Sequence, residues 1–181
     1  ALIKDGSTVC TIGMTLVSAS ETILKAIEAR YLESRHPANI TYVHSCGQSD
    51  RDRGCQHLAH EGLIGRIIGG HWGLQPRMME LIAGNKMLAY NLPQGQFAQL
   101  YRSMAGGEPG KITKVGLGTF VDPRLGGGKM NEVTRSAPDI VDIVTIDGEE
   151  YMRYKPIPLD FCIIRGTCID ELGNLTTDEE A

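Results

Sequence analysis

Short apolar segments rich in β-branched residues alternate with segments of helical periodicity over the first 118 residues, and the connections between them are short. This alternation predicts βαβ units and therefore an α/β fold with an open, mostly parallel sheet that has helices on both faces. We expect strands at Ser7–Gly13, Asn39–Gly47, Gly65–Gly73, Met87–Pro93 and Lys111–Gly118, and helices at Ser18–Ser34, Gln56–Ile64, Leu74–Lys86 and Gln94–Gly107.

The pattern changes after residue 118. An Asp147-Gly148 pair lies between two alternating segments, which predicts a late β-hairpin. Leu159–Asp170 is then an apolar run, which we expect to form a central strand. The chain holds no internal repeat, low-complexity tract or linker, so residues 1–181 are expected to form a single domain.

Both ends resemble interrupted helices. The first six residues are typical of a last helical turn closed by Gly6, and Thr177 followed by acidic residues is typical of a helix start. From this we expect the chain to be a fragment, or one half of a larger protein.

Most of the predicted parallel strands end in glycine or a small polar residue. In an open α/β sheet, ligands bind at the carboxyl ends of the strands. Glycine there allows the backbone to approach a ligand, and the N–H groups of a following helix can hold an anion. Tight-turn chemistry explains any one of these glycines, whereas five strand ends with the same feature favour a binding edge. They are Gly13, Ser45–Gly47, Gly69–His71, Asn91–Gly95 and Gly116–Gly118.

The glycine-rich segment Val115–Asn131 contains fragments that resemble phosphate-binding loops. A P-loop needs a glycine at the place of Pro123 and a hydroxyl residue at the place of Met130, and a dinucleotide fingerprint needs a glycine at the place of Val121. Neither nucleotide motif is therefore supported. An irregular segment of this length in a compact domain is usually functional or disordered.

Metal and nucleophile candidates are sparse. Cys46, Cys55, His57 and His60 lie within fifteen residues of one another, but only the two histidines are closely spaced, so a core cysteine and surface histidines are favoured over a metal site. Glu61, at a small-residue turn, is the one carboxylate considered as a nucleophile. A surface or capping role is the more common one for such a residue.

The composition excludes several classes of function. A net charge of −4 argues against non-specific nucleic-acid binding. The sequence has no run of about 18 apolar residues, the length that a membrane-spanning helix needs. The five cysteines are scattered through apolar stretches with no disulfide framework. These features predict a cytoplasmic protein with no nucleic-acid or membrane partner.

Six segments together resemble the family I coenzyme A-transferases, and most closely the first half of the acetate/propionate/3-oxoacid type. The resemblance covers essentially all 181 residues. Two stretches, "YNLPQG" and "GLGTFVDPRLGGGK", are specific to the family. The segments are "DGSTVCTIG", "HPANITYVHSCGQ", "HEGLIGRIIGGHWGLQP", "KMLAYNLPQG", "KITKVGLGTFVDPRLGGGKMN" and "IPLDFCIIRGTCIDELGNLTTDEEA".

The resemblance implies a fold shared with sugar-phosphate isomerases and a ping-pong transfer of CoA from an acyl-CoA to a carboxylate. The route passes through a glutamyl-CoA thioester. No metal or redox cofactor takes part, and CoA is a substrate. The nucleophilic glutamate belongs to the family's second half, beyond Ala181, so no catalytic residue is expected in this chain. It would be the alpha-type half, which pairs with a beta-type half in cis or in trans within a homo- or hetero-oligomer.

The resemblance also implies a substrate and oxyanion site. Its residues are Gly13, Gly47, Gln48, Gln94, Gly95, Gly118, Thr119 and Phe120. Neutral donors of this kind suit the negative charge that develops when a carboxylate attacks a thioester. The chain departs from the family pattern in the turn after Gly13, where Leu16 and Ser20 replace a glycine and a proline, and this leaves the role of that turn open.

Two other functions remain open. A non-catalytic sugar-phosphate or small-anion binding domain would need basic residues near the strand ends, where Arg51, Arg53, Arg124 and Lys129 are the candidates. A sugar-phosphate isomerase would need its own acid/base pair, for which Glu61 is the candidate base.

Overall fold

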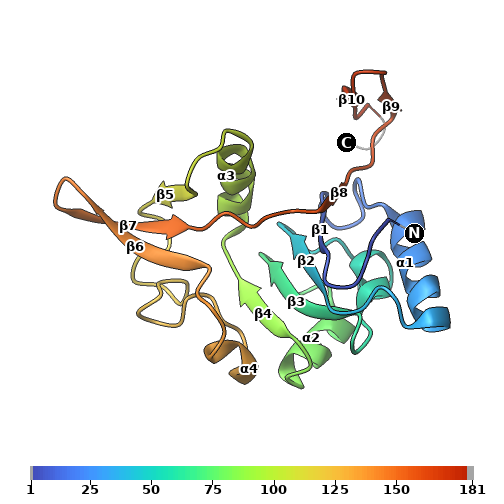
Figure 1. The fold of residues 1–181 in the computed structure, drawn as a ribbon, viewed down its shortest axis with the longest axis horizontal. Helices are drawn as coiled ribbons and strands as arrows, with labels where there is room; N and C mark the ends of the chain where they lie inside the picture. The colour runs from blue at the N-terminus through green and yellow to red at the C-terminus, as the bar shows by residue number, and fades with distance from the viewer. Residues whose placement is uncertain (1, 179–181) are drawn as a thin grey trace.

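The structure is a computed structural model that describes residues 2–178. Its main sheet has five strands in the order β4-β3-β2-β1-β8, and every neighbouring pair is parallel (Figure 1). This confirms the predicted open parallel sheet. The strands are β1 (Thr8–Thr11), β2 (Ile40–His44), β3 (Ile64–Gly69), β4 (Leu88–Asn91) and β8 (Phe161–Ile163).

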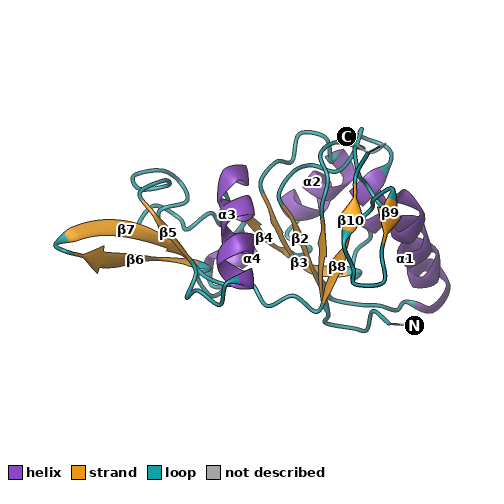
Figure 2. Ribbon diagram, turned by 90° about the horizontal axis from the view of Figure 1, so that it is seen from above, coloured by secondary structure: helices purple, strands orange, loops and turns teal. Residues whose placement is uncertain are grey.

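Both faces of this sheet are covered. Apolar residues of α1 (Glu21–Ser34), the 3₁₀ helix η1 (Gly54–Leu58) and α2 (Pro76–Ala83) pack together on one face. On the other face lies α3 (Gln94–Ala105) (Figure 2). Successive strand residues point to opposite faces, so Val9 belongs to the first core and Cys10 to the second.

A second, antiparallel sheet extends away from the main one (Figures 1 and 2). It contains β5 (Lys111–Thr113), β6 (Val141–Ile146) and β7 (Glu149–Tyr154), and its buried Met152 and Tyr154 join the α3 core. The Asp147-Gly148 turn joins β6 to β7, which confirms the predicted hairpin. Three short elements complete the fold, namely α4 (Glu132–Arg135), β9 (Cys168–Ile169) and β10 (Leu175–Thr176).

The predicted strand Lys111–Gly118 was placed in the wrong sheet. Only Lys111–Thr113 is extended, and it pairs antiparallel with β7. Gly116 and Gly118 have φ values of +105° and +71°, so the chain turns where the prediction had it continue.

The predicted central strand at Leu159–Asp170 was wrong in length and position. It spans three residues as β8 and pairs with β1 at the border of the sheet that residues 2–178 form. Its attachment is fixed by Asp160, whose carboxylate accepts a hydrogen bond from Thr8 N at 2.8 Å and whose N–H donates to Thr8 O at 3.0 Å.

Two predicted helices were also wrong. Of Gln56–Ile64 only the start is helical, as part of η1, because the chain leaves helical geometry at Ala59, whose ψ is +62°, and turns again at Gly62. Residues 2–6 form no helix, and Gly6 N instead donates to Ala38 O at 2.9 Å. The helix expected after Thr177 lies mostly outside the described residues.

Candidate functional site at the carboxyl ends of the strands

Four neighbouring strands end side by side in the order β4, β3, β2 and β1 (Figure 1). Because all four are parallel, the residues that follow them lie along one edge of the sheet. Five of the eight predicted site residues lie there, and we call this group the strand-end site. They are Gly13 after β1, Gly47 and Gln48 after β2, and Gln94 and Gly95 after β4.

Gln48 joins the ends of β1 and β2. Its side chain is fully buried, and its Nε2 donates to Thr11 O at 2.9 Å, while the Thr11 hydroxyl donates to its Oε1. Tyr42 Oη lies 2.6 Å from the same Thr11 hydroxyl. These contacts occupy the Gln48 amide, so its side chain serves here to hold the Gly13 turn beside β2.

Gln94 lies beside the residues that follow β2. Its Nε2 is 3.6 Å from Cys46 Sγ. A methyl group added at Gly70 would overlap the Ser45 carbonyl oxygen and lie 2.7 Å from Gln94 Cγ. Glycine at position 70 therefore allows the chain segments after β2, β3 and β4 to come together.

The helix α3 begins at the strand-end site. Gln94 is its first residue, and the N–H groups of a first helical turn have no partner within the helix. Gln94 and Gly95 are both exposed, and a methyl group added at Gly95 would meet no atom within 4 Å. Neutral donors next to open space suit a small anion or a developing oxyanion.

The turn after β1 is a tight one. Met14 N donates to Val17 O at 3.1 Å and Val17 N donates back to Met14 O at 2.9 Å. A methyl group at Gly13, whose φ is +149°, would lie 2.6 Å from Val17 O, so only glycine fits there. Met14 is 61% exposed at the tip of this turn, next to the strand-end site.

The other three predicted site residues lie in the glycine-rich loop. Gly118 N donates to Asp122 Oδ2 at 3.0 Å, Thr119 Oγ1 donates to Gly116 O at 2.8 Å, and Phe120 O accepts from Gly128 N. These hydrogen bonds are local to the loop and do not join it to the strand-end site. The Phe120 side chain is 57% exposed.

The end of the same loop packs along the free edge of β4. Asn91 N donates to Gly128 O at 2.7 Å, Met130 N donates to Ala89 O at 2.9 Å, and Tyr90 forms a bridge with Lys129. The loop thus covers an edge that would otherwise expose unpaired backbone groups.

Glu61 lies at the amino-terminal ends of the strands, on the side of the main sheet away from the strand-end site. It precedes β3 by three residues, and its neighbours Gly62 and Leu63 accept hydrogen bonds from Asn39 and Ile40 at the start of β2. Its carboxylate is 3.0 Å from Lys86 Nζ on the surface. This placement separates Glu61 from the carboxyl ends of the strands.

His44 was missed by the sequence analysis. It ends β2 inside the core, with its ring 5.2 Å from that of Trp72, and neither ring nitrogen has a hydrogen-bond partner. Burial lowers the pKa of His44 to about 4. His71, the residue before the buried Trp72, is exposed. The sequence does contain a sign of this burial, because alternate residues of a strand point to the same face and His44 follows the buried Ile40 and Tyr42 at that spacing.

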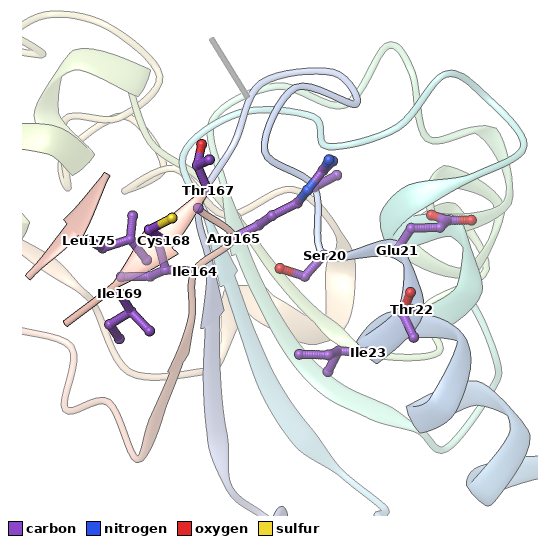
Figure 3. Close-up of a pocket in the computed structure, with 12 residues that line it drawn as sticks. Ser20, Glu21, Thr22, Ile23, Ile164, Arg165, Thr167, Cys168, Ile169 and Leu175 are labelled. Atoms are coloured by element: carbon purple, nitrogen blue, oxygen red, sulfur yellow. The ribbon is translucent and has the colours of Figure 1, made fainter. Parts of the chain in front are cut away.

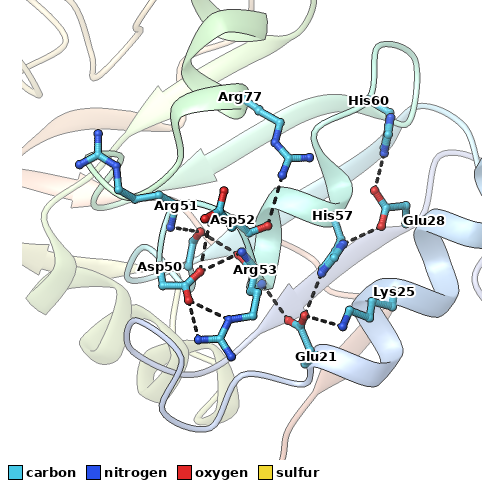
Figure 4. A network of polar contacts seen from close by, with 12 residues as sticks. Glu21, Lys25, Glu28, Asp50, Arg51, Asp52, Arg53, His57, His60 and Arg77 are labelled. Atoms are coloured by element: carbon cyan, nitrogen blue, oxygen red, sulfur yellow. Dashed lines mark hydrogen bonds and ion pairs between the residues drawn. The ribbon is translucent and has the colours of Figure 1, made fainter.

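The two closely spaced histidines form a polar network with α1 (Figure 4). His57 lies between Glu21 and Glu28, and His60 Nε2 is 2.7 Å from Glu28 Oε1. Cys55 is buried in the core. Within residues 2–178 no three His, Cys, Asp or Glu side chains are arranged to hold a metal ion.

A cavity of about 550 Å³ opens between the start of α1 and the segment 164–175 (Figure 3). Ser20, Glu21 and Ile23 line one wall, and Ile164 and Leu175 line the other. This cavity adjoins the Gly13 turn through Ala19 and mixes apolar with polar side chains.

Comparison with known proteins assigns the chain to a family. The sequence model of the family described as coenzyme A transferase matches residues 1–181. The chain belongs to the coenzyme A transferase family. This confirms the resemblance found from its sequence segments.

Curated members of the coenzyme A transferase family are similar to the chain over its whole length. It is 45% identical to the caffeate CoA-transferase of Acetobacterium woodii over 180 residues, which are 99% of this chain and 34% of that protein. It is 41% identical to the acetate CoA-transferase YdiF of Escherichia coli (strain K12), over 98% of this chain and 34% of that protein. The chain therefore spans about one third of the length of these relatives.

Solved structures of coenzyme A transferases share the fold. The acyl-CoA transferase YdiF from E. coli O157:H7, solved as a thioester complex with CoA, superposes with a TM-score of 0.90 at 41% identity, over 97% of this chain and 36% of that chain. Glutaconate coenzyme A-transferase from Acidaminococcus fermentans superposes with a TM-score of 0.71 at 13% identity, over 98% and 56%. The second similarity supports the fold alone.

Proposed function

We propose that this chain is the alpha-type half of an enzyme that transfers CoA between an acyl-CoA and a short-chain carboxylate, of the acetate, propionate or 3-oxoacid type. The transfer passes through a glutamyl-CoA thioester formed on a partner half. The observation that carries the proposal is the strand-end site, where Gln94 and Gly95 offer neutral donors at an exposed helix start in a chain of this family.

The chemistry of thioester exchange suits such donors. When a carboxylate attacks a thioester carbonyl, negative charge develops on the carbonyl oxygen and needs preorganised hydrogen-bond donors. The Gly95 N–H and the Gln94 amide supply them without a full charge. A site rich in lysine would also hold the free acid tightly, and equal stabilisation of ground state and transition state does not speed the chemical step.

The nucleophile comes from elsewhere in this proposal. Glu61 lies at the amino-terminal ends of the strands, away from the strand-end site, and pairs with Lys86. The alpha subunit of the acetoacetyl-CoA:acetate/butyrate CoA transferase of Clostridium acetobutylicum is 27% identical to the chain over 171 residues, which are 94% of this chain and 68% of that protein. That protein's name supports the division of the catalytic unit into halves.

The family resemblance assigns the loop residues Gly118, Thr119 and Phe120 to the acyl pocket, although their own hydrogen bonds stay within the loop. The exposed Phe120 ring offers an apolar surface, and the Asp122 carboxylate holds the Gly118 backbone in place. Arg124 donates to that carboxylate at 2.8 and 2.9 Å, and this contact holds the pKa of Asp122 far below its usual value. The loop is therefore shaped before a substrate arrives.

The sugar-phosphate alternative lacks support. Three of its four candidate basic residues already pair with carboxylates. Arg53 is 2.6 Å from Asp50, Arg124 is 2.8 Å from Asp122, and Lys129 is 2.7 Å from Asp139.

Among residues 2–178 no helix is long and apolar enough to cross a membrane. A cytoplasmic location stays a prediction.

An exchange assay tests the proposed function. The chain alone should not exchange CoA between acetyl-CoA and propionate, and the chain joined to or mixed with its partner half should. Gln94→Ala should lower kcat/KM in the assembled enzyme, while Gln99→Ala, at another exposed position of α3, should leave it unchanged. Exchange by the isolated chain, or equal activity of the two variants, would count against the proposal.

A further inference from the structure

Two cysteines from segments far apart in the sequence lie side by side in the main sheet. Cys10 of β1 and Cys162 of β8 are direct partners in the parallel register. Neighbouring strands lie about 4.8 Å apart, and the Cα–Cα separation of disulfides is about 4.4–6.8 Å. The backbone spacing at this pair is therefore compatible with a disulfide.

The two side chains point to the same face of the sheet. Cys10 belongs to the core beneath α3, whereas Phe161 and Ile163 pack on the α1 side, so the alternation of β8 turns Cys162 toward Cys10. This arrangement places the two thiols next to each other on that face. Cys10 Sγ further lies 3.4 Å from Tyr101 Oη of α3.

The two thiols differ in access and in acidity. Cys10 is 1% exposed, whereas Cys162 is exposed. The neighbouring Cys10 thiol lowers the pKa of Cys162, and the same neighbourhood together with burial raises the pKa of Cys10. An accessible thiol with thiolate character is the one that attacks an external disulfide.

We propose that Cys162 and Cys10 form an oxidisable dithiol site, at which a low-molecular-weight disulfide such as glutathione disulfide introduces a Cys10–Cys162 bond. The Cys162 thiolate attacks one sulfur of glutathione disulfide and releases one glutathione thiolate. The Cys10 thiol then loses its proton and attacks Cys162 Sγ, which releases the second thiolate. Both thiolates take up protons, so two protein thiols are oxidised and one glutathione disulfide is reduced to two glutathione molecules.

The bond would fix β8 to β1, the strand with which β8 pairs in the described sheet. It would also remove the hydrogen bond from Cys10 to Tyr101. The site is independent of the proposed transferase activity, because neither cysteine belongs to the strand-end site.

Thiol counting and peptide mapping of the purified protein after treatment with glutathione disulfide test this site. The number of free thiols should fall from five to three, and a disulfide-linked pair of peptides should contain Cys10 and Cys162. Dithiothreitol should restore all five. Cys168→Ser removes another exposed cysteine of the same chain segment and should leave the Cys10–Cys162 link intact, while Cys162→Ser should abolish it.

Cys10→Ala separates the two steps. This variant should retain one glutathione on Cys162 as a stable mixed disulfide, because the thiol that displaces it is gone. Five unreacted thiols in the wild-type protein, a stable glutathione adduct at Cys162 despite the presence of Cys10, or a link through Cys168 would each overturn the proposal.

Discussion

The imidazole Nδ1 of His57 lies 2.6 Å from the Glu28 carboxylate. The other ring nitrogen lies 2.8 Å from the carboxylate of Glu21, which is the first residue of α1. His57 therefore holds η1 against two points of the same helix. Both ring nitrogens of His57 therefore face carboxylate oxygens, which accept hydrogen bonds. This contact fixes the start of α1, which follows the Gly13 turn of the strand-end site.

Loss of the His57 ring should destabilise the fold. His57→Ala should lower the free energy of unfolding by about 1–3 kcal/mol, since hydrogen bonds to partly buried carboxylates are among the stronger ones. Urea denaturation measures this. The control is His36→Ala, which removes an exposed ring paired with Asp5 and should have a much smaller effect. Equal losses in the two variants would contradict the structural role given to His57.

The same network predicts how stability depends on pH. Burial opposes the ionisation of Glu21 and Glu28, but the hydrogen bonds that they accept, above all from His57 and His60, hold both pKa values below the ordinary 4.5. A carboxyl group with a lowered folded-state pKa stabilises the fold above its unfolded pKa, and this contribution is lost as the pH falls through the folded value. Unfolding free energy should therefore decline below about pH 4.5, and less so in Glu28→Gln.

Gly95→Ala should separate activity from folding. The added methyl group meets no atom of the chain and lies in a helix, so stability should stay equal or rise by about 0.5–1 kcal/mol. The group fills the open space next to the proposed donors, so kcat/KM for CoA exchange should fall at least tenfold. Gly106→Ala, at the other end of α3 in ordinary packing contact, is the control and should keep full activity. Full activity of Gly95→Ala would exclude a substrate from this space.

The glycine-rich loop predicts a contrast between two of its glycines. Gly118 and Gly128 have nearly the same φ, +71° and +73°, so alanine at either position should cost about 1–2 kcal/mol through backbone strain. At Gly128 the methyl group would also lie 2.5 Å from Asn91 O, where the loop packs on β4, whereas at Gly118 it meets nothing within 4 Å. Gly128→Ala should therefore be the less stable variant in thermal or urea unfolding. The reverse order would contradict the packing of the loop on β4.

The parallel sheet could be predicted because its strands carry apolar residues on both faces and are separated by amphipathic helices. The alternation from Val9 to Cys10 already places residues in two cores. The position of β8 could not be predicted, because the apolar run Leu159–Asp170 fits a central and a border strand equally well. Its place depends on the distant Asp160–Thr8 contacts.

The edge of the sheet where several of the proposed site residues lie was predictable to a similar extent. Glycine at the strand ends indicated the edge where Gly13, Gly47 and Gln94 follow three strands of one sheet. What local sequence did not reveal was how Gln48 is used, since its amide is occupied by Thr11, a residue 37 positions away. The burial of His44 beside Trp72 likewise arises from packing between β2 and the segment after β3.

Locating the covalent intermediate tests the central claim most directly. The assembled enzyme, with its partner half present, is incubated with an acyl-CoA, and the enzyme-bound thioester is converted by hydroxylamine to a hydroxamate that mass spectrometry assigns to a peptide. The account predicts a modified glutamate on the partner half, none within residues 1–181, and unchanged labelling in Glu61→Gln. A hydroxamate at Glu61, or at any other carboxylate of this chain, would contradict it.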